Sequence, residues 1–170
     1  MTTAIADASA LVSLGVVAQS EPDPLSLFLT SYDVLLPPEI LAELEETASY
    51  DDEHGQAATI VLDRRGVFTV QEVDLDTTFP LDDGENAAVT LANESDASLF
   101  LCDEFNQLGL IHASLVNSRL VTTPTLLSVF VQTERLAAGD ALALLDEISE
   151  VRSWNDNSYV QRARSLFEQC

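Results

Sequence analysis

Short apolar runs alternate with helical patterns along the whole of this 170-residue chain. The runs at residues 3–7, 33–36, 67–70, 97–102 and 120–122 each have the length of a buried strand, and amphipathic stretches lie between them. This alternation is typical of an α/β protein, in which the strands pair in parallel and the helices pack on the sheet. We therefore expect a three-layer α/β fold with a parallel central sheet flanked by helices.

Individual helices are also indicated by local residues. Pro24 favours a helix that begins there, because proline fits the first helical turn. Residues 55–65 predict a helix that is closed by Gly66. Two amphipathic helices are expected over about 138–168, as a helical C-terminal extension. The chain has no internal repeat or linker, so we expect one domain over residues 1–170, with its core at about 3–135.

The charge of the chain is strongly unbalanced. Asp and Glu number 29 against seven basic residues, all of them Arg, which gives a net charge of −22. Such charges repel one another at low salt, whereas at 1 M salt the screening length falls to about 3 Å. We therefore expect a protein adapted to a high-salt cytoplasm. A weak basic footprint does not exclude a nucleic-acid substrate there, because counterion release contributes little in molar salt.

Several classes of site are excluded by missing residues. The six glycines are dispersed and no Gly-Lys pair occurs, so there is no phosphate-binding glycine loop. A Gly-x-Ser-x-Gly nucleophile motif is also missing. His54 and His112 are isolated, and Cys102 and Cys170 have neither zinc-ligand spacing nor the pattern of a disulfide framework.

Membrane and export signals are missing as well. No apolar run reaches the roughly 18 residues that a bilayer span needs. Met1-Thr2-Thr3 lacks the basic start of a signal peptide. We therefore expect a cytoplasmic protein that makes no membrane contact.

Two acidic residues directly follow predicted strands. Asp7 ends the run Thr3 to Ala6, and Asp103 ends the run Ala97 to Cys102. Carboxylates after parallel strands lie at the carboxyl edge of the sheet, where α/β folds bind ligands. Two such carboxylates repel unless a cation lies between them, so a divalent-metal site is the leading interpretation. The alternative for Asp7 is a helix cap.

Two more acids belong to predicted helices. Glu43 lies in an acidic helix and by itself is typical of a helix surface. Glu85 is near the start of the helix opened by Asp82-Asp83-Gly84, where the helix dipole stabilises acids. Glu104 is expected to face solvent. Two small hydroxyl residues beside the same sheet edge could orient a carboxylate or a water, or cap a helix: Ser9 and Thr123.

Five motifs in this order carry a resemblance to a known family. They are Ala4 to Val12, Val34 to Leu44, Leu81 to Val89, Leu99 to Glu104 and Val121 to Pro124. The chain resembles the PIN-domain nucleases over roughly residues 3–135, in particular VapC-like toxins and their archaeal relatives. This likeness implies a parallel sheet with four acids at its carboxyl edge that hold Mg²⁺ or Mn²⁺.

The resemblance assigns the metal-binding and catalytic acids to Asp7, Glu43, Glu85 and Asp103, with Ser9 and Thr123 in support. Oxygen ligands suit these hard cations. The metal would lower the pKa of a bound water and neutralise charge on the scissile phosphate of RNA. Many relatives carry basic residues soon after the fourth acid, whereas here the first Arg after Asp103 is Arg119.

The function implied by the likeness is a metal-dependent endoribonuclease, the toxin of a toxin–antitoxin pair. Its partners would be an RNA substrate, a small antitoxin protein and a second copy of the chain in a homodimer. The alternative is a catalytically weak or inactive PIN-like module that acts through protein contacts. A metal-dependent phosphatase or a DNA-directed nuclease with the same acids is a third reading.

Overall fold

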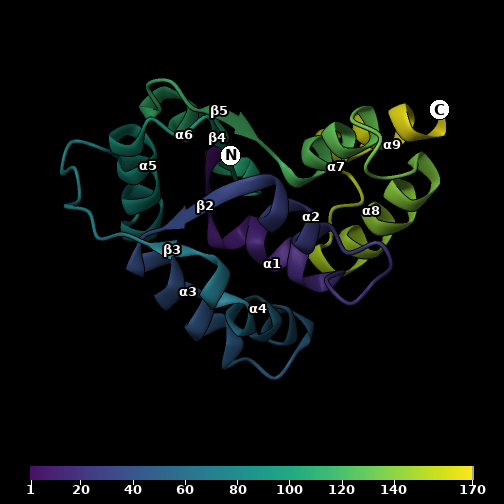
Figure 1. Ribbon diagram of the computed structural model, residues 1–170, viewed down its shortest axis with the longest axis horizontal. Helices are drawn as coiled ribbons and strands as arrows, with labels where there is room; N and C mark the ends of the chain where they lie inside the picture. Colours follow the sequence, from purple (N-terminus) through teal and green to yellow (C-terminus); the bar gives the residue numbers. More distant parts are fainter. Residues whose placement is uncertain (170) are drawn as a thin grey trace.

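A computed structural model describes residues 1–169, and within them the centre is a five-stranded parallel sheet (Figure 1). The strands are β1 (Thr2–Ala6), β2 (Tyr32–Leu36), β3 (Thr69–Val70), β4 (Leu99–Leu101) and β5 (Arg119–Val121). Their order across the sheet is β3-β2-β1-β4-β5, and every pair is parallel. The predicted α/β fold with a parallel central sheet is confirmed.

Helices of the described residues flank this sheet. They are α1 (Ala8–Val16), α2 (Pro24–Ser31), α3 (Pro38–Ala48), α4 (Glu53–Asp63), α5 (Asp83–Ser95), α6 (Leu108–Ser114), α7 (Thr123–Gln132), α8 (Ala138–Arg152) and α9 (Ser158–Glu168). Two 3₁₀ turns, η1 (Arg65–Val67) and η2 (Phe105–Gln107), precede β3 and α6. No helix within residues 1–169 combines the length and apolar character that a membrane span requires.

The strand order places a topological switch point beside β1. The chain moves from β1 to β2 and β3 on one side, and then returns to β4 and β5 on the other side. In open α/β sheets, ligands bind at the carboxyl ends of the strands at such a point. The crevice between the ends of β1 and β4 is therefore where the fold favours a site.

The core is built around β1 and α1. Ala4, Ile5 and Ala6 are fully buried, and β1 pairs with β2 and β4 on its two sides. Helix α1 is buried along nearly its whole length, because it packs against α4 and α8 as well as the neighbouring elements. This burial explains why Asp7 is the only charged residue between Thr2 and Val16.

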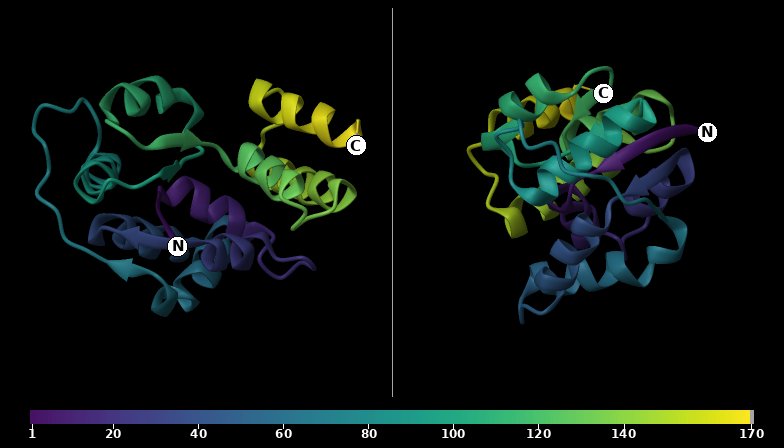
Figure 2. Two further views of the ribbon diagram at one scale, coloured as in Figure 1. Left: turned by 45° about the horizontal axis from the view of Figure 1, so that its top comes forward. Right: turned by 90° about the vertical axis from the view of Figure 1, so that its left-hand side faces the viewer.

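The C-terminal helices form a group of their own at one end of the molecule. Helices α7, α8 and α9 pack against one another, and α8 also packs against α1 (Figures 1 and 2). Helices α5 and α6 lie at the opposite end of the view in Figure 1. The two helices expected over 138–168 are present as α8 and α9. Just after the end of α8, Trp154 packs against Phe105, which follows β4.

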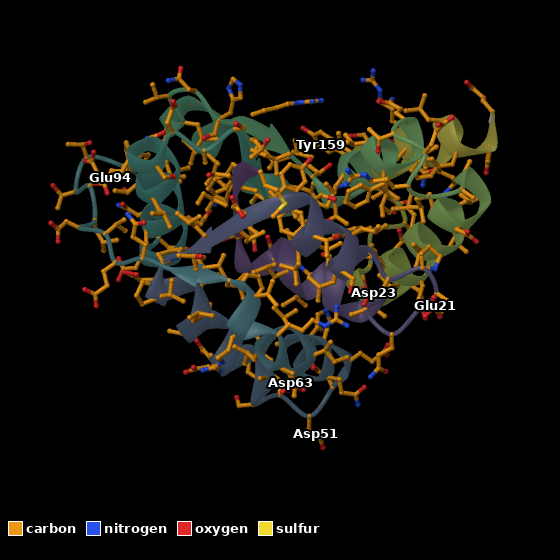
Figure 3. All side chains as sticks on the ribbon, viewed as in Figure 1. Glu21, Asp23, Asp51, Asp63, Glu94 and Tyr159 are labelled. Carbon is orange, nitrogen blue, oxygen red and sulfur yellow. The ribbon has the colours of Figure 1, made fainter. Side chains whose placement is uncertain are left out.

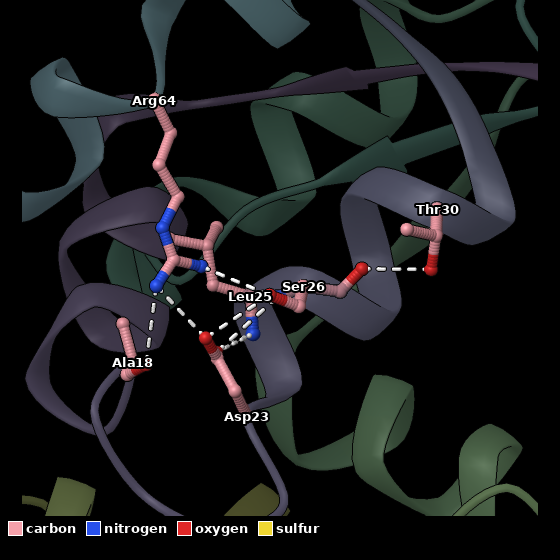
Figure 4. Close-up of polar contacts among 6 residues, drawn as sticks. All are labelled: Ala18, Asp23, Leu25, Ser26, Thr30 and Arg64. Atoms are coloured by element: carbon pink, nitrogen blue, oxygen red, sulfur yellow. Dashed lines mark hydrogen bonds and ion pairs between the residues drawn. The ribbon is translucent and has the colours of Figure 1, made fainter.

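One ion pair ties α2 to α4. Asp23 caps α2 by accepting from the backbone of Leu25 and Ser26, and its carboxylate lies 2.8 Å from the Arg64 guanidinium (Figure 4). Arg64 also donates to the Ala18 carbonyl. Helix α2 begins at Pro24 as predicted.

The region before β3 differs from the prediction. Helix α4 ends at Asp63, and Gly66 lies inside the 3₁₀ turn η1 instead of closing the helix at residue 65. Strand β3 is limited to two exposed residues, because it lies at the edge of the sheet and pairs only with β2.

Candidate metal centre

The four predicted acids all lie on elements that begin at the carboxyl edge of the sheet. Asp7 directly follows β1, and Asp103 lies two residues after β4. Glu43 is in α3, which follows β2, and Glu85 is in the first turn of α5. Because β1 is paired with both β2 and β4, three of these acids come from neighbouring strand–helix units. Helix α5 joins them by packing against β1 and α3.

Asp7 is buried, with 3% of its surface exposed. Its Oδ2 accepts from the Ser9 hydroxyl at 2.8 Å, and it caps α1 by accepting from the Ser9 backbone N–H. The other oxygen, Oδ1, is buried and has no hydrogen-bond partner among the described residues. The cap and the functional reading of Asp7 are therefore compatible, since one oxygen caps and the other is left unpaired.

Asp103 is also buried, but both of its oxygens are bonded. Oδ1 accepts from the Thr123 backbone N–H at 2.7 Å, and Oδ2 accepts from the Thr123 hydroxyl at 2.5 Å. The Asp103 backbone N–H donates to the Ser9 hydroxyl at 3.1 Å. Ser9 therefore links Asp7 to Asp103, and Thr123 fixes the Asp103 carboxylate.

The two hydroxyl residues consequently orient carboxylates. The caps of their helices are other residues, Asp7 for α1 and Thr122 for α7. Cys102 adds a thiol 3.8 Å from Asp7 Oδ2, and burial raises the pKa of that thiol, which keeps it protonated as a weak donor.

Glu43 reaches from α3 to the start of α5. A Cβ atom placed on Gly84 would lie 1.8 Å from Glu43 Oε1, so the carboxylate rests on backbone that only glycine leaves bare. Glu43 is half-buried. It is therefore not an ordinary helix-surface glutamate, which was the alternative reading of its sequence context.

Glu85 is in α5, next to the Gly84 that Glu43 contacts. Its side chain is buried, with 8% exposed, and Oε2 has no hydrogen-bond partner among the described residues. Its backbone N–H donates to Asp82 Oδ1 at 2.8 Å, so Asp82 caps the helix and brings a further carboxylate to the same place. A glutamate that only complemented the helix dipole would stay in solvent.

The carboxyl groups perturb one another. Burial, and then the Asp7 and Asp82 carboxylates, raise the pKa of Glu43 to about 7. Burial and the adjacent Asp82 raise the pKa of Glu85 to about 8. Burial also raises the pKa of Asp7 and of Asp103, against the hydrogen bonds from Ser9 and Thr123 that favour their ionised forms. For Glu43 and Glu85, both burial and repulsion between carboxylates favour protonation.

Two orphaned oxygens in this cluster are suited to a divalent cation. Asp7 Oδ1 and Glu85 Oε2 are buried acceptors without donors, which is costly unless a cation or water satisfies them. Hard cations such as Mg²⁺ prefer carboxylate oxygens. Among residues 1–169, however, no three His, Cys, Asp or Glu side chains are gathered closely enough to hold an ion as they stand. The donors fit in chemistry, and the carboxylates would have to converge on the ion.

The structure also brings in residues that the sequence analysis did not assign to the site. One is Asp82, whose position as a helix cap is readable from sequence but whose proximity to Glu85 and Asp7 is not. The other is Arg152, from the end of α8. It lines a cavity of about 250 Å³ together with Ser9, Glu43 and Glu104. Burial lowers its pKa and the Asp103 carboxylate opposes that shift, but a guanidinium stays charged.

No signal in the sequence points to Arg152. A basic residue in the last turn of a helix is favoured by the helix dipole, and nothing more would be read from it. Glu104 is exposed, as predicted.

Comparison with known protein families agrees with this arrangement. A family model described as a PIN domain matches residues 3–169. Proteins of this kind are generally nucleases, which typically use divalent metals. No curated protein matches the chain. Since the matched region covers nearly all of the sequence, the chain belongs to the PIN-domain family.

Proposed function

We propose that this protein is a Mg²⁺- or Mn²⁺-dependent endoribonuclease whose site acids are Asp7, Glu43, Glu85 and Asp103. The observation that carries the proposal is the pair of buried, unpaired oxygens, Asp7 Oδ1 and Glu85 Oε2, at the switch point of a PIN-type sheet. Membership of a family of nucleases supports phosphodiester hydrolysis. The choice of RNA follows the likeness of the five motifs to VapC-like proteins.

Each residue would have a distinct task. Thr123 holds the Asp103 carboxylate through two hydrogen bonds, and Ser9 holds Asp7 through one, so both acids are oriented before an ion binds. Glu43 and Glu85 would complete the ligand set once they lose their protons. When bound, a divalent ion lowers the pKa of its water and neutralises charge on the scissile phosphate. Preorientation of the acids reduces the cost of assembling the site.

The test is Mn²⁺-dependent cleavage of a labelled single-stranded RNA at about 2 M KCl by wild type and by Asp103→Asn. Cleavage by wild type that the variant loses, with both proteins equally folded by circular dichroism, is the expected result. Equal cleavage by the two proteins would show that Asp103 is not needed for cleavage and would contradict the proposed site. Cleavage of a DNA strand or of a phosphomonoester, but not RNA, would favour the phosphatase or DNA-directed nuclease reading.

We propose further that the enzyme is the toxin of a toxin–antitoxin pair, acts in the cytoplasm as a homodimer, and is silenced by a small antitoxin. This proposal rests on the VapC-like motifs alone. Induced expression of the wild-type protein should arrest growth of the host cells, whereas expression of Asp103→Asn should not. Growth arrest by both would point instead to a non-catalytic PIN-like module that acts through protein contacts.

A further inference from the structure

Most of the chain's cations are engaged in contacts between surface elements. Within residues 1–169, three of the seven Arg form ion pairs: Arg64 with Asp23, Arg65 with Glu45, and Arg164 with Asp146. Figure 4 shows that the Arg64 guanidinium pairs with Asp23 and donates hydrogen bonds to the Ser26 hydroxyl and the Ala18 carbonyl. Arg135 donates to Ser31. Arg152 differs from these four in its contacts.

The position of Arg152 is held by its neighbours. It is the last residue of α8, and Ser153 turns the chain with a left-handed φ of 59° while Trp154 N donates to Ser149 O at 3.0 Å. Trp154 is buried and packs against Phe105 in a T-shaped arrangement, with 5.1 Å between the ring centroids. Phe105 lies two residues after Asp103. The end of α8 is therefore anchored to the loop that carries a predicted site acid.

The Arg152 side chain is near both this anchor and some of the acids. Its guanidinium carbon is 6.0 Å from the centroid of the Trp154 ring. The side chain lines the same cavity as Glu43 and Ser9, and it is attracted by the carboxylates of Asp103, Glu104 and Asp7. Arg152 thus brings a positive charge from the end of α8 to the candidate metal centre.

Despite these acids, the guanidinium is not paired. Within residues 1–169, no carboxylate lies within the 4.0 Å of an ion pair with Arg152, and no group accepts a hydrogen bond from it. An arginine that served only to neutralise these acids would bond to one of them directly. A half-buried guanidinium with its N–H donors free is instead available to a ligand.

The ligand must be an anion that can enter a cavity lined by acids. Glu43, Glu46 and Glu104 line the cavity and repel any anion, so the ligand must also meet a compensating positive charge. A phosphodiester of RNA is suited, because the divalent ion of the proposed site would attract it and a planar guanidinium can bind phosphate through two N–H donors.

We propose that Arg152 is a substrate-binding residue that contacts a backbone phosphate of the RNA at the acid site. It would supply, from the C-terminal helices, the positive charge that is missing from the residues after Asp103. This inference rests on the proposed ribonuclease function and deepens it.

The experiment measures binding and cleavage of one fluorescent single-stranded RNA of mixed sequence by wild type, Arg152→Gln, Arg152→Lys and Arg162→Gln. Binding is read by fluorescence anisotropy with Ca²⁺ in place of Mn²⁺, and a gel checks that the RNA stays intact. Mn²⁺ binding without RNA is read from the rise in melting temperature. Arg162→Gln is the matched control. Arg162 is an exposed arginine on the neighbouring helix α9, and its substitution removes the same charge as Arg152→Gln does.

Arg152→Gln should weaken RNA binding about tenfold, the loss expected for a charge-assisted hydrogen bond. Arg152→Lys should weaken it about threefold, because lysine keeps the charge and loses the planar fork. The Mn²⁺ midpoint of Arg152→Gln should be unchanged or lower, since a cation that repels the metal has been removed. Arg162→Gln should match wild type in all three measurements.

RNA binding by Arg152→Gln equal to that of wild type would overturn the proposal. A lowered melting temperature together with a lost Mn²⁺ response would also overturn it, because Arg152 would then be a structural counter-ion. If Arg152→Gln does not fold, Arg152→Lys decides: threefold weaker RNA binding with an unchanged Mn²⁺ midpoint supports the proposal, and wild-type binding refutes it.

The two proposals fail in different ways. Cleavage by wild type with no effect of Arg152→Gln on RNA binding refutes the role of Arg152 alone. RNA binding that depends on Arg152 without any cleavage refutes the ribonuclease function alone. A wild type that binds no RNA refutes both.

Discussion

At the scale of single residues, the candidate site is defined by what each buried carboxylate bonds to. Asp103 has donors from Thr123 on both oxygens, whereas Asp7 has one bonded and one orphaned oxygen. A buried unpaired acceptor costs free energy unless a ligand satisfies it. The orphaned oxygens therefore mark where the protein gains most from binding a cation.

Asp7→Asn should abolish the Mn²⁺-induced rise in melting temperature and leave the fold intact. The amide keeps the shape of the side chain and removes a charge that repels Glu43. The ion-free variant should be as stable as wild type or more stable. Thermal melts with and without Mn²⁺ measure this, with Asp63→Asn, an exposed acid labelled in Figure 3, as the control. A Mn²⁺ response that survives in Asp7→Asn would exclude Asp7 as a ligand.

Gly84→Ala should weaken metal binding without unfolding the protein. The new Cβ would meet Glu43 Oε1 at 1.8 Å, and the flexible end of Glu43 must move away from α5. Helix propensity alone would stabilise the variant by about 1 kcal/mol. Gly139→Ala in α8 is the matched control, since its Cβ would meet nothing within 4 Å. An equal Mn²⁺ midpoint for the two variants would contradict a role of Glu43 at the site.

The stability of the ion-free protein should fall as the pH rises from about 6 to 9. Folding raises the pKa of Glu43 from 4.5 to about 7 and that of Glu85 from 4.5 to about 8. The folded state therefore binds these protons more tightly than the unfolded state, so their contribution is complete below pH 4.5 and is lost through pH 7 to 8.

Melting temperatures in EDTA across this pH range measure the effect. The double variant Glu43→Gln, Glu85→Gln should show a flatter profile, because it has no protons to lose at these positions. In saturating Mn²⁺ the melting temperature should instead rise with pH, since the metal competes with protons for the same carboxylate oxygens. A wild type whose melting temperature rises between pH 6 and 9 in EDTA would show that these glutamates are ionised in the folded state.

At the scale of elements, the site depends on where helices begin and end. Helices α1, α3 and α5 all start at the carboxyl edge of the sheet and carry Asp7, Glu43 and Glu85 there. Helix α8 ends at the same place, anchored by Trp154 against Phe105. Strand pairing alone places the aspartates, and helix packing places the remaining groups.

Trp154→Ala should destabilise the protein by about 3 to 5 kcal/mol, the usual cost of deleting a buried aromatic side chain. It should also weaken RNA binding as Arg152→Gln does, because α8 would lose its anchor beside Asp103. Urea unfolding and RNA anisotropy measure the two effects, and Trp154→Phe should lose less in both. Full RNA affinity in a destabilised Trp154→Ala would show that Arg152 does not need this anchor.

At the scale of the whole molecule, charge dominates. The net charge is −22, and Figure 3 shows acids such as Glu21, Asp51 and Glu94 at the periphery, where they are exposed. Unscreened, these charges repel one another and favour expansion of the chain. The described ion pairs are few and mostly exposed, so they offset little of this repulsion.

Lowering KCl from about 2 M to 0.1 M should lower the melting temperature markedly, because the screening length grows from under 3 Å to about 10 Å. A thermal melt at each salt concentration measures this. Sucrose at matched osmolality is the control and should not restore the lost stability as KCl does. A melting temperature independent of KCl would refute adaptation to high salt.

Much of the fold could be predicted from sequence because it depends on local patterns. Apolar runs of strand length and 3.6-residue periodicity are readable along the chain, and alternation of the two implies parallel pairing. The ends of helices and strands are predicted less accurately, as at Gly66 and β3, because the extent of an edge strand depends on what it pairs with.

The parallel α/β class and the order of the acidic motifs follow from the sequence, since a residue that follows a strand must lie at the sheet's edge. Which oxygens of those acids are left without donors depends on tertiary packing. The tertiary structure also brings Glu43 against Gly84 and lets the charge of Asp103 act on Arg152. These juxtapositions join residues 41 and 49 positions apart, and helix packing, which no local pattern encodes, sets them.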